Sequence, residues 1–213
     1  MDIKIIVDLR DQFVAIRDQG TRPTCMAFAA SDAHSFARGS AEALSAEYAF
    51  FHAVRRTASK DRTKGVSLRL MSQTISNNGQ PGELGWPYLS NLSTTDKWEP
   101  PDNPGTIFCR KTNLLGADVA SVYSNLDACR PVILVINISQ SFLRATPGTV
   151  LRAPANEPRI NTHAVVALGY GESEGERCLL IRNSWGKGWC DAGYAWVHED
   201  SVVPKLAGAA RKV

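Results

Sequence analysis

The sequence feature that could do chemistry is a cysteine at the expected start of a helix. Cys25 directly follows Pro23 and Thr24, and apolar residues recur at helical spacing after it. The dipole of a helix favours negative charge at this end, which is expected to lower the pKa of the thiol and to populate a nucleophilic thiolate. Acyl transfer by a thiolate further needs a general base, a group that orients the base, and oxyanion donors.

Each of these further roles has a candidate residue elsewhere in the chain. His163 stands at the mouth of an apolar strand and could be the base. Asn183, in the segment Ile181-Arg182-Asn183-Ser184-Trp185-Gly186, could orient the histidine. Gln19 precedes Cys25 by six positions and could donate a side-chain N–H to an oxyanion.

The other residues of the same types receive structural interpretations. We expect His34, His52 and His198 to be surface or hydrogen-bonded histidines without a catalytic role. We expect three further cysteines to be buried thiols that behave as small apolar residues: Cys109, Cys129 and Cys178.

Composition excludes several broad classes of protein. The 213 residues include 24 Lys and Arg against 21 Asp and Glu, a net charge of +3, which predicts neither a nucleic-acid-binding stripe nor a polybasic membrane patch. The hydrophobic share of 44% excludes wholesale disorder. Because the cysteine count of 5 is odd, at least one thiol must lie outside any internal disulfide.

The N-terminal residues and the cysteine spacing predict a compartment. The segment 1–8 is charged and lacks the apolar core of a signal peptide, and no apolar run approaches the length of a membrane span. We therefore expect a cytoplasmic protein whose cysteines are reduced. No Cys-x-x-Cys pair exists, so we expect no metal site, and nothing suggests a cofactor.

The first half of the chain has helical patterns and the second half has strand patterns. Helices are predicted over 25–36 with Gly39 as a stop, after Ser45 through Val54, and over 67–77. Short strands rich in β-branched residues are predicted at 132–136, 164–168, 178–181 and 194–197. Helices followed by strands predict an α+β chain of two packed lobes with a ligand site between them.

Several ordered segments resemble the papain-like cysteine peptidases, clan CA family C1. The resemblance covers nearly the whole chain and is strongest around the four candidate residues. The matching segments are Val7-Asp8-Leu9-Arg10, Asp18-Gln19-Gly20-Thr21-Arg22-Pro23-Thr24-Cys25, Asn161-Thr162-His163-Ala164-Val165-Val166-Ala167-Leu168-Gly169, and Asn183-Ser184-Trp185-Gly186 followed by Gly188-Trp189-Cys190.

The resemblance implies a fold and a role for each residue. It implies one papain-like domain over 1–213, with a mainly helical lobe at about 18–114 and an antiparallel, β-barrel-like lobe at about 115–213 that includes the N-terminal segment. The active site would lie in the cleft between the lobes. Cys25 would be the nucleophile paired with protonated His163, Asn183 would orient the imidazole, Gln19 would serve the oxyanion hole, and Trp185 would cover the His–Asn bond.

Five positions depart from the family pattern. Arg22 replaces a cysteine, and the Cys-x-Gly-Gly segment of the family is replaced around 65–68. Those two cysteines form a disulfide in secreted and lysosomal members, so their joint absence agrees with a reducing compartment. Met26 replaces Trp, Thr162 replaces Asp, and Cys190 replaces Gly. The middle of the chain looks more like a bacterial branch of the family than like animal cathepsins.

The leading expectation is thiol-dependent hydrolysis of peptide or isopeptide bonds in a protein or peptide substrate. The chain begins almost where the mature family domain begins, so we expect no propeptide and hypothesise a regulatory protein partner in its place. Two alternatives stay open: an acyltransferase or transpeptidase that uses the same acyl-enzyme, and a catalytically silent peptide-binding module. No nucleic-acid or membrane partner is expected.

Overall fold

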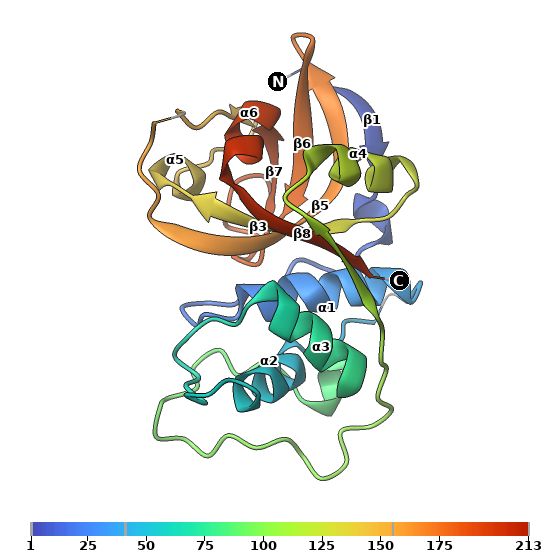
Figure 1. Ribbon diagram of the computed structural model, residues 1–213, viewed down its shortest axis with the longest axis vertical. Coiled ribbons are helices and arrows are strands. Elements are labelled where there is room, and N and C mark those ends of the chain that lie inside the picture. Colours follow the sequence, from blue (N-terminus) through green and yellow to red (C-terminus); the bar gives the residue numbers. More distant parts are fainter. Residues whose placement is uncertain (1, 41, 155, 213) are drawn as a thin grey trace.

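A helical lobe and a sheet lobe meet along helix α1 (Cys25–Ala37). The computed structural model describes residues 2–40, 42–154 and 156–212. In Figure 1, the sheet lobe lies above and the helical lobe below, and α1 crosses the molecule between them. The N-terminus of α1, which carries Cys25, therefore lies where the two lobes meet.

The helical lobe contains the three helices that the sequence predicts. α2 (Ala46–Arg55) and α3 (Leu68–Asn77) are both capped by serines, because Ser45 Oγ and Ser67 Oγ accept the N–H of the residue three positions ahead at 3.0 and 3.3 Å. These hydrogen bonds satisfy N–H groups that have no partner inside the helix. The α+β class with helices first is confirmed.

Helix α1 begins at Cys25 as predicted, and it lacks a side-chain cap at its N-terminus. Thr24 occupies the N-cap position without a side-chain capping bond, and its hydroxyl is hydrogen-bonded to Tyr88 Oη at 2.8 Å. The helix continues to Ala37, and Gly39 follows with a φ of +64°. A positive φ suits glycine, which explains why the predicted stop is correct.

The sheet lobe is built on one eight-stranded sheet in which β5 is central. The strand order is β2-β8-β3-β5-β6-β7-β4, and β1 pairs with β5. The pairs are antiparallel except β4 with β7, which is parallel and so departs from the antiparallel expectation. The strands are β1 (Lys4–Asp8), β2 (Thr112–Gly116), β3 (Val132–Ile138), β4 (Val150–Leu151), β5 (Asn161–Ser173), β6 (Glu176–Arg182), β7 (Tyr194–His198) and β8 (Leu206–Lys212).

The sequence patterns missed half of these strands and several short helices. β8 reads Leu-Ala-Gly-Ala-Ala-Arg-Lys, with no β-branched residue, and it becomes a strand because it lies between β2 and β3. The unpredicted helices are α4 (Val119–Asp127), α5 (Gln140–Leu143), α6 (Glu199–Val202), and the 3-10 turns Arg10–Gln12, Glu83–Gly85 and Val203–Lys205.

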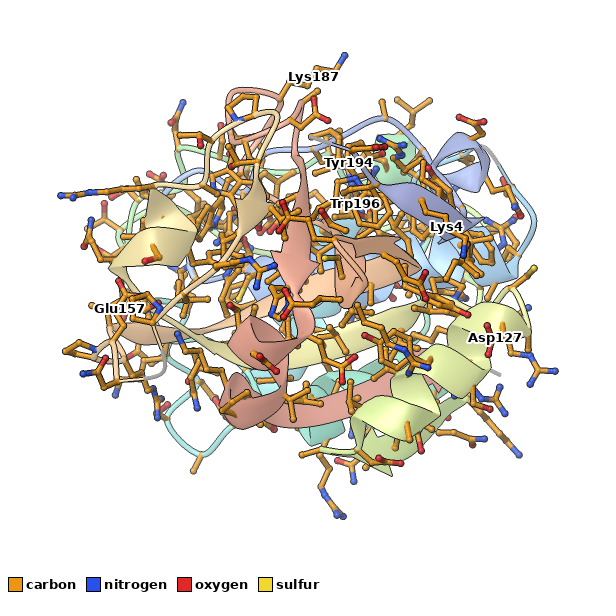
Figure 2. The ribbon with its side chains drawn as sticks, turned by 90° about the horizontal axis from the view of Figure 1, so that it is seen from above. Lys4, Asp127, Glu157, Lys187, Tyr194 and Trp196 are labelled. Carbon is orange, nitrogen blue, oxygen red and sulfur yellow. The ribbon has the colours of Figure 1, made fainter. Side chains whose placement is uncertain are left out.

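Two hydrophobic cores lie on opposite faces of the sheet. Along β5, Val166 and Leu168 pack with α1, α2 and α3, whereas Val165 and Ala167 pack with α4. Because both faces are covered, the strand is apolar at successive positions rather than alternating. Viewed from above, Trp196 lies among the side chains of the sheet lobe while the side chain of Lys187 extends from its edge (Figure 2).

All five cysteines are free thiols, but two of them are not buried as expected. Cys178 is buried, whereas Cys109 and Cys129 are exposed. Cys129 stands in the turn after α4 with a φ of +53°, and turns of this kind lie at the surface. Among the described residues, no helix has the length and apolar character needed to cross a membrane.

Candidate active site

Cys25 and His163 lie on the walls of one cavity of about 520 Å³ between the lobes. Cys25 comes from the start of α1 and His163 from the first part of β5, so the packing of α1 on β5 brings them together. The sequence separates these residues widely, and only the meeting of the two lobes joins them. The cavity is further lined by Met26, Gly65, Val66, Ser67, Leu68, Arg69, Val135, Asn161, Thr162, Ala164 and Ala207.

His163 is hydrogen-bonded to Asn183, as the sequence led us to expect. His163 Nε2 lies 2.7 Å from Asn183 Oδ1, and the same oxygen accepts the backbone N–H of Ser184 at 2.8 Å. Because a backbone N–H can only donate, the Asn183 atom must be the carbonyl oxygen, and Nε2 of His163 must carry the proton. In the neutral imidazole, Nδ1 is then left as the basic atom.

Aromatic rings enclose the His163–Asn183 pair. The ring centroids of Trp185 and His163 are 4.5 Å apart with the planes inclined by 35°. Phe142 contacts the rings of Trp185, Trp189 and His163, with centroids 5.6, 5.2 and 6.0 Å away. Because His163 and Asn183 are both buried, this shell excludes water from the hydrogen bond between them.

Gln19 is buried beside Ser184, and both the oxygen and the nitrogen of its side-chain amide are hydrogen-bonded. Gln19 Oε1 accepts the hydroxyl hydrogen of Ser184 at 2.7 Å, and Gln19 Nε2 donates to the carbonyl oxygen of Arg22 at 2.7 Å. An amide nitrogen has two hydrogens. The second hydrogen of Nε2 has no protein partner within 2–40, 42–154 and 156–212.

Arg22 forms a buried ion pair that the sequence patterns did not predict. Its guanidinium donates to both carboxylate oxygens of Glu47, at 2.6 and 2.9 Å, and to the carbonyl oxygen of Leu89 at 2.8 Å. Glu47 is fully buried and also accepts from Trp98 Nε1 at 2.7 Å. The residue that replaces a family cysteine thus ties the Gln19–Cys25 segment to α2 and to a long loop.

The pKa values of Cys25 and His163 both shift toward the neutral forms. Burial raises the pKa of the Cys25 thiol, and hydrogen bonds from the backbone amides of Ala164, Met26 and Cys25 itself act in the opposite direction. Burial lowers the pKa of His163 to about 4, against the effect of its bond to Asn183. The helix start alone was expected to lower the thiol pKa, and desolvation of the half-buried sulfur reverses that expectation.

The remaining departures from the family pattern fall at the cavity and beside it. The segment 65–68 and Met26 line the cavity, and Thr162 donates its hydroxyl hydrogen to Asn137 Oδ1 at 3.2 Å. Cys190 is half-buried with a φ of +43°, a conformation that glycine adopts more readily. Within the described parts of the chain, no group of three or more His, Cys, Asp or Glu side chains could hold a metal ion.

Comparison with known proteins identifies the family. Residues 5–210 match the family model described as papain family cysteine protease, so the chain belongs to that family. It is 27% identical over 193 residues to a cysteine protease of Blomia tropicalis, covering 85% of this chain and 56% of the relative. It is 24% identical to mouse pro-cathepsin H, covering 92% and 59%. The chain thus spans little more than half the length of these curated relatives.

Solved structures share the fold at low sequence identity. A Carica candamarcensis cysteine protease in complex with E-64 has a TM-score of 0.77 at 20% identity, and the match covers 97% of both chains. Procathepsin L 3 of Tenebrio molitor has a TM-score of 0.76 at 20% identity, with 97% of this chain and 69% of that one covered. The two-lobe papain-like fold is therefore confirmed. The relatives named here are eukaryotic, and the resemblance to a bacterial branch stays a prediction.

Proposed function

We propose that this protein is a papain-like peptidase that cleaves peptide or isopeptide bonds with Cys25 as the nucleophile. The observation that carries the proposal is the hydrogen bond between His163 and Asn183, because His163 lines the same cavity as Cys25. Its tautomer leaves Nδ1 of His163 as the only basic ring atom, as a general base requires. Membership of the papain family cysteine proteases supports the same reaction class.

The proposed first half-reaction transfers the acyl group to the enzyme. Cys25 Sγ attacks the substrate carbonyl carbon while His163 Nδ1 takes the thiol proton. The carbonyl oxygen becomes an oxyanion that accepts hydrogen bonds from the free N–H of Gln19 Nε2 and from the backbone N–H of Cys25. Because Cys25 is the first residue of α1, its backbone N–H has no acceptor inside the helix. The C–N bond then breaks, and the leaving amine receives the proton from His163.

The second half-reaction restores the enzyme with water. His163 Nδ1 accepts a proton from water, and the resulting hydroxide adds to the carbonyl carbon of the thioester. The C–S bond breaks, the acid product leaves, and the sulfur regains the proton. An amine in place of water would give acyl transfer, so the mass of the product distinguishes the two outcomes.

Burial of Cys25 and His163 affects how the thiolate forms. Since burial disfavours a lone thiolate and a lone imidazolium, transfer of the thiol proton to His163 creates both charges together, and each stabilises the other. Asn183 Oδ1 supports the imidazolium through the Nε2 hydrogen bond. We propose that the ion pair forms when a substrate occupies the cavity and its carbonyl is available for attack.

The lining of the cavity favours an apolar substrate side chain next to the cleaved bond. Away from Cys25 and His163, the walls include the apolar residues Val66, Leu68, Val135, Ala164 and Ala207. Apolar side chains gain by leaving water for such a site. We expect Ala207→Glu to lower kcat/KM for a peptide with leucine at this position and to raise it for a peptide with arginine there. Equal loss for both peptides would contradict this assignment.

We also propose that the protein works in a reducing compartment such as the cytoplasm. Its five cysteines are free thiols, and an ion pair holds the segment that a disulfide secures in secreted members of the family. We therefore expect the protein to have the same unfolding midpoint with and without a reductant.

The decisive test is selective labelling of the thiols. E-64, which is bound in the structure of the Carica protease, should modify Cys25 in the intact protein and leave Cys109 and Cys129 unmodified. The two exposed thiols are the internal reference, because iodoacetamide at alkaline pH should modify them. Cys25→Ser should abolish E-64 labelling and peptide cleavage, whereas Cys109→Ser should change neither.

The proposal fails if E-64 modifies the exposed thiols as fast as Cys25, or if Cys25→Ser retains cleavage. Labelling of Cys25 without cleavage of a broad peptide library would instead favour the silent peptide-binding module.

A further inference from the structure

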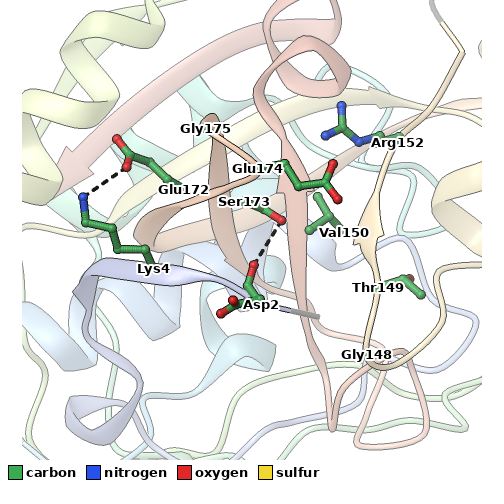
Figure 3. Close-up of a pocket in the computed structure, with 10 residues that line it drawn as sticks. All are labelled: Asp2, Lys4, Gly148, Thr149, Val150, Arg152, Glu172, Ser173, Glu174 and Gly175. Carbon is green, nitrogen blue, oxygen red and sulfur yellow. Dashed lines mark hydrogen bonds and ion pairs between the residues drawn. The ribbon is translucent and has the colours of Figure 1, made fainter.

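Two of the hollows away from the proposed active site differ in the charge of their lining residues. The larger, about 560 Å³, lies between β1, β4 and the turn from β5 to β6 (Figure 3). Its lining carries two cations, Lys4 and Arg152, and three carboxylates, Asp2, Glu172 and Glu174. Both cations are paired, because Lys4 Nζ lies 3.3 Å from Glu172 Oε2 and Arg152 forms an ion pair with Glu176. This hollow therefore offers no excess of positive charge to an anionic ligand.

The second hollow, about 390 Å³, has only cations among its charged lining residues. It lies where the end of α1 meets the start of β3 and the end of β8, and in Figure 1 the C-terminal end of β8 reaches α1 there. Three side chains of α1 and Pro131 form its apolar wall. The full lining is Ala33, Phe36, Ala37, Arg110, Arg130, Pro131, Arg211 and Lys212. We call this hollow the cationic pocket.

No carboxylate of the described residues pairs with these cations. The ion pairs of residues 2–40, 42–154 and 156–212 involve none of Arg110, Arg130, Arg211 and Lys212. The polar contacts of their side chains are Lys212 Nζ with Thr112 Oγ1 at 3.0 Å and a long bond of Arg211 to the backbone. Among the described residues, four cationic side chains thus line one pocket without a carboxylate partner.

Lys212 makes this arrangement unfavourable in the absence of an anion. The residue is only 7% exposed, and a buried ammonium is strongly destabilising without an anionic partner. Burial and the nearby Arg110 lower the pKa of Lys212 to about 7. A bound anion would hold the ammonium in its charged form and would offset the repulsion among the arginines.

We propose that the cationic pocket binds a small organic phosphate with at least two negative charges. Arginine guanidinium groups donate in a planar fork that matches phosphate oxygens, and the pocket supplies three of them together with one ammonium. The apolar wall of Phe36 and Pro131 suits the organic part of the ligand. A volume of about 390 Å³ is that of a small-molecule site rather than of a polymer groove.

This site is separate from the proposed catalytic cavity. The pocket touches the last turn of α1, whereas Cys25 is the first residue of that helix. Binding therefore does not depend on the proposed peptidase reaction. The test uses the Cys25→Ser variant as well as the native chain, and both should bind equally.

The experiment is titration calorimetry at constant ionic strength with three probes: phosphate, pyrophosphate and phenyl phosphate. We expect saturable binding of one probe molecule per chain, with pyrophosphate and phenyl phosphate bound more tightly than phosphate. Arg130→Gln should weaken binding by about tenfold, since a charged hydrogen bond is lost. Arg130 is exposed, so this variant should fold normally. Lys4→Gln removes the same charge from the first hollow, which shares no lining residue with the cationic pocket, and should bind the probes like the wild type.

A second variant tests the buried ammonium group of Lys212. Lys212→Met should abolish pyrophosphate binding and, without ligand, raise the thermal midpoint, because an unpaired buried charge is removed. If pyrophosphate does not saturate the native chain, or if Lys4→Gln weakens binding as much as Arg130→Gln, the proposal is wrong. Tighter binding of phenyl phosphate than of pyrophosphate is the result expected for an organic phosphate, and the reverse order would overturn the assignment to an organic ligand.

Discussion

His163 Nε2 lies 2.7 Å from Asn183 Oδ1, inside a shell of aromatic side chains that excludes water. His163 lies on β5, and Asn183 directly follows β6. These two strands are paired in the sheet. The carbonyl oxygen of Asn183 is identified by the backbone N–H of Ser184, and this determines which nitrogen of His163 holds the proton. The side chain of Asn183 thereby determines that Nδ1 is the unprotonated nitrogen of the neutral imidazole.

Asn183→Ala should lower kcat by about 10²-fold, because the imidazole loses its orientation and its preferred tautomer. KM should change little, since Asn183 is buried behind His163 and does not line the cavity. The measurement is steady-state hydrolysis of a fluorogenic peptide between pH 5 and pH 8. Asn113→Ala, on the exposed side of β2, is the matched control. Full activity of Asn183→Ala would show that Asn183 has no role in the mechanism.

Gln19→Ala should lower kcat by about 10²–10³-fold, the loss typical of one oxyanion donor. Gln19→Glu should be similarly impaired, because it keeps the shape and replaces the N–H donor with an acceptor. Peptide hydrolysis measures the effect, and Gln12→Ala, an exposed glutamine of the same loop region, controls for nonspecific damage. A Gln19→Glu variant with native kcat would show that the amide N–H does not contact the oxyanion.

Arg22→Met should lower the free energy of unfolding by about 3–5 kcal/mol, because it leaves the carboxylate of Glu47 buried without its cation. The double variant Arg22→Met, Glu47→Leu should be more stable than Arg22→Met alone, since no charge is then buried unpaired. Urea unfolding measures both differences. Arg55→Met, an exposed arginine of α2, should change stability by less than 1 kcal/mol. A double variant less stable than Arg22→Met would contradict this account.

His34 should make the protein less stable as the pH falls from 6.5 to 4. Its Nδ1–H donates to Gln80 Oε1 at 3.0 Å, because Gln80 Nε2 is occupied as a donor to Ser45 O. Burial lowers the pKa of His34 to about 4, so the unfolded chain binds a proton in this range and the folded chain does not. The loss is complete once the pH is below about 4, and it amounts to about 3 kcal/mol at most.

Unfolding in urea at several pH values between 4 and 7 tests this prediction. His34→Gln should flatten the dependence, although it should lower stability at pH 7. His52→Gln, at a less buried histidine of α2, should leave most of the dependence in place. An unchanged pH slope in His34→Gln would assign the effect to other groups, such as His163.

Local sequence signals were sufficient to predict helices α1, α2 and α3, whereas α4, α5 and α6 were missed. Serine caps and glycine stops act within one helical turn, so α2, α3 and the end of α1 could be predicted. Strand β5 could be recognised because both of its faces are buried. Strand β8 could not, because its pairing depends on β2 and β3 rather than on its own residues.

The sequence by itself determined which residues can do chemistry and in which order they occur along the chain. Only the tertiary structure decided their protonation, because burial of Cys25 opposes the effect of the helix start, and burial depends on the opposite lobe. The same holds for Arg22, which pairs with Glu47 on helix α2, and for Lys212, which shares a pocket with Arg110 and Arg130 from distant segments. Desolvation and ion pairing act through space, so their outcome depends on which segments the fold brings together.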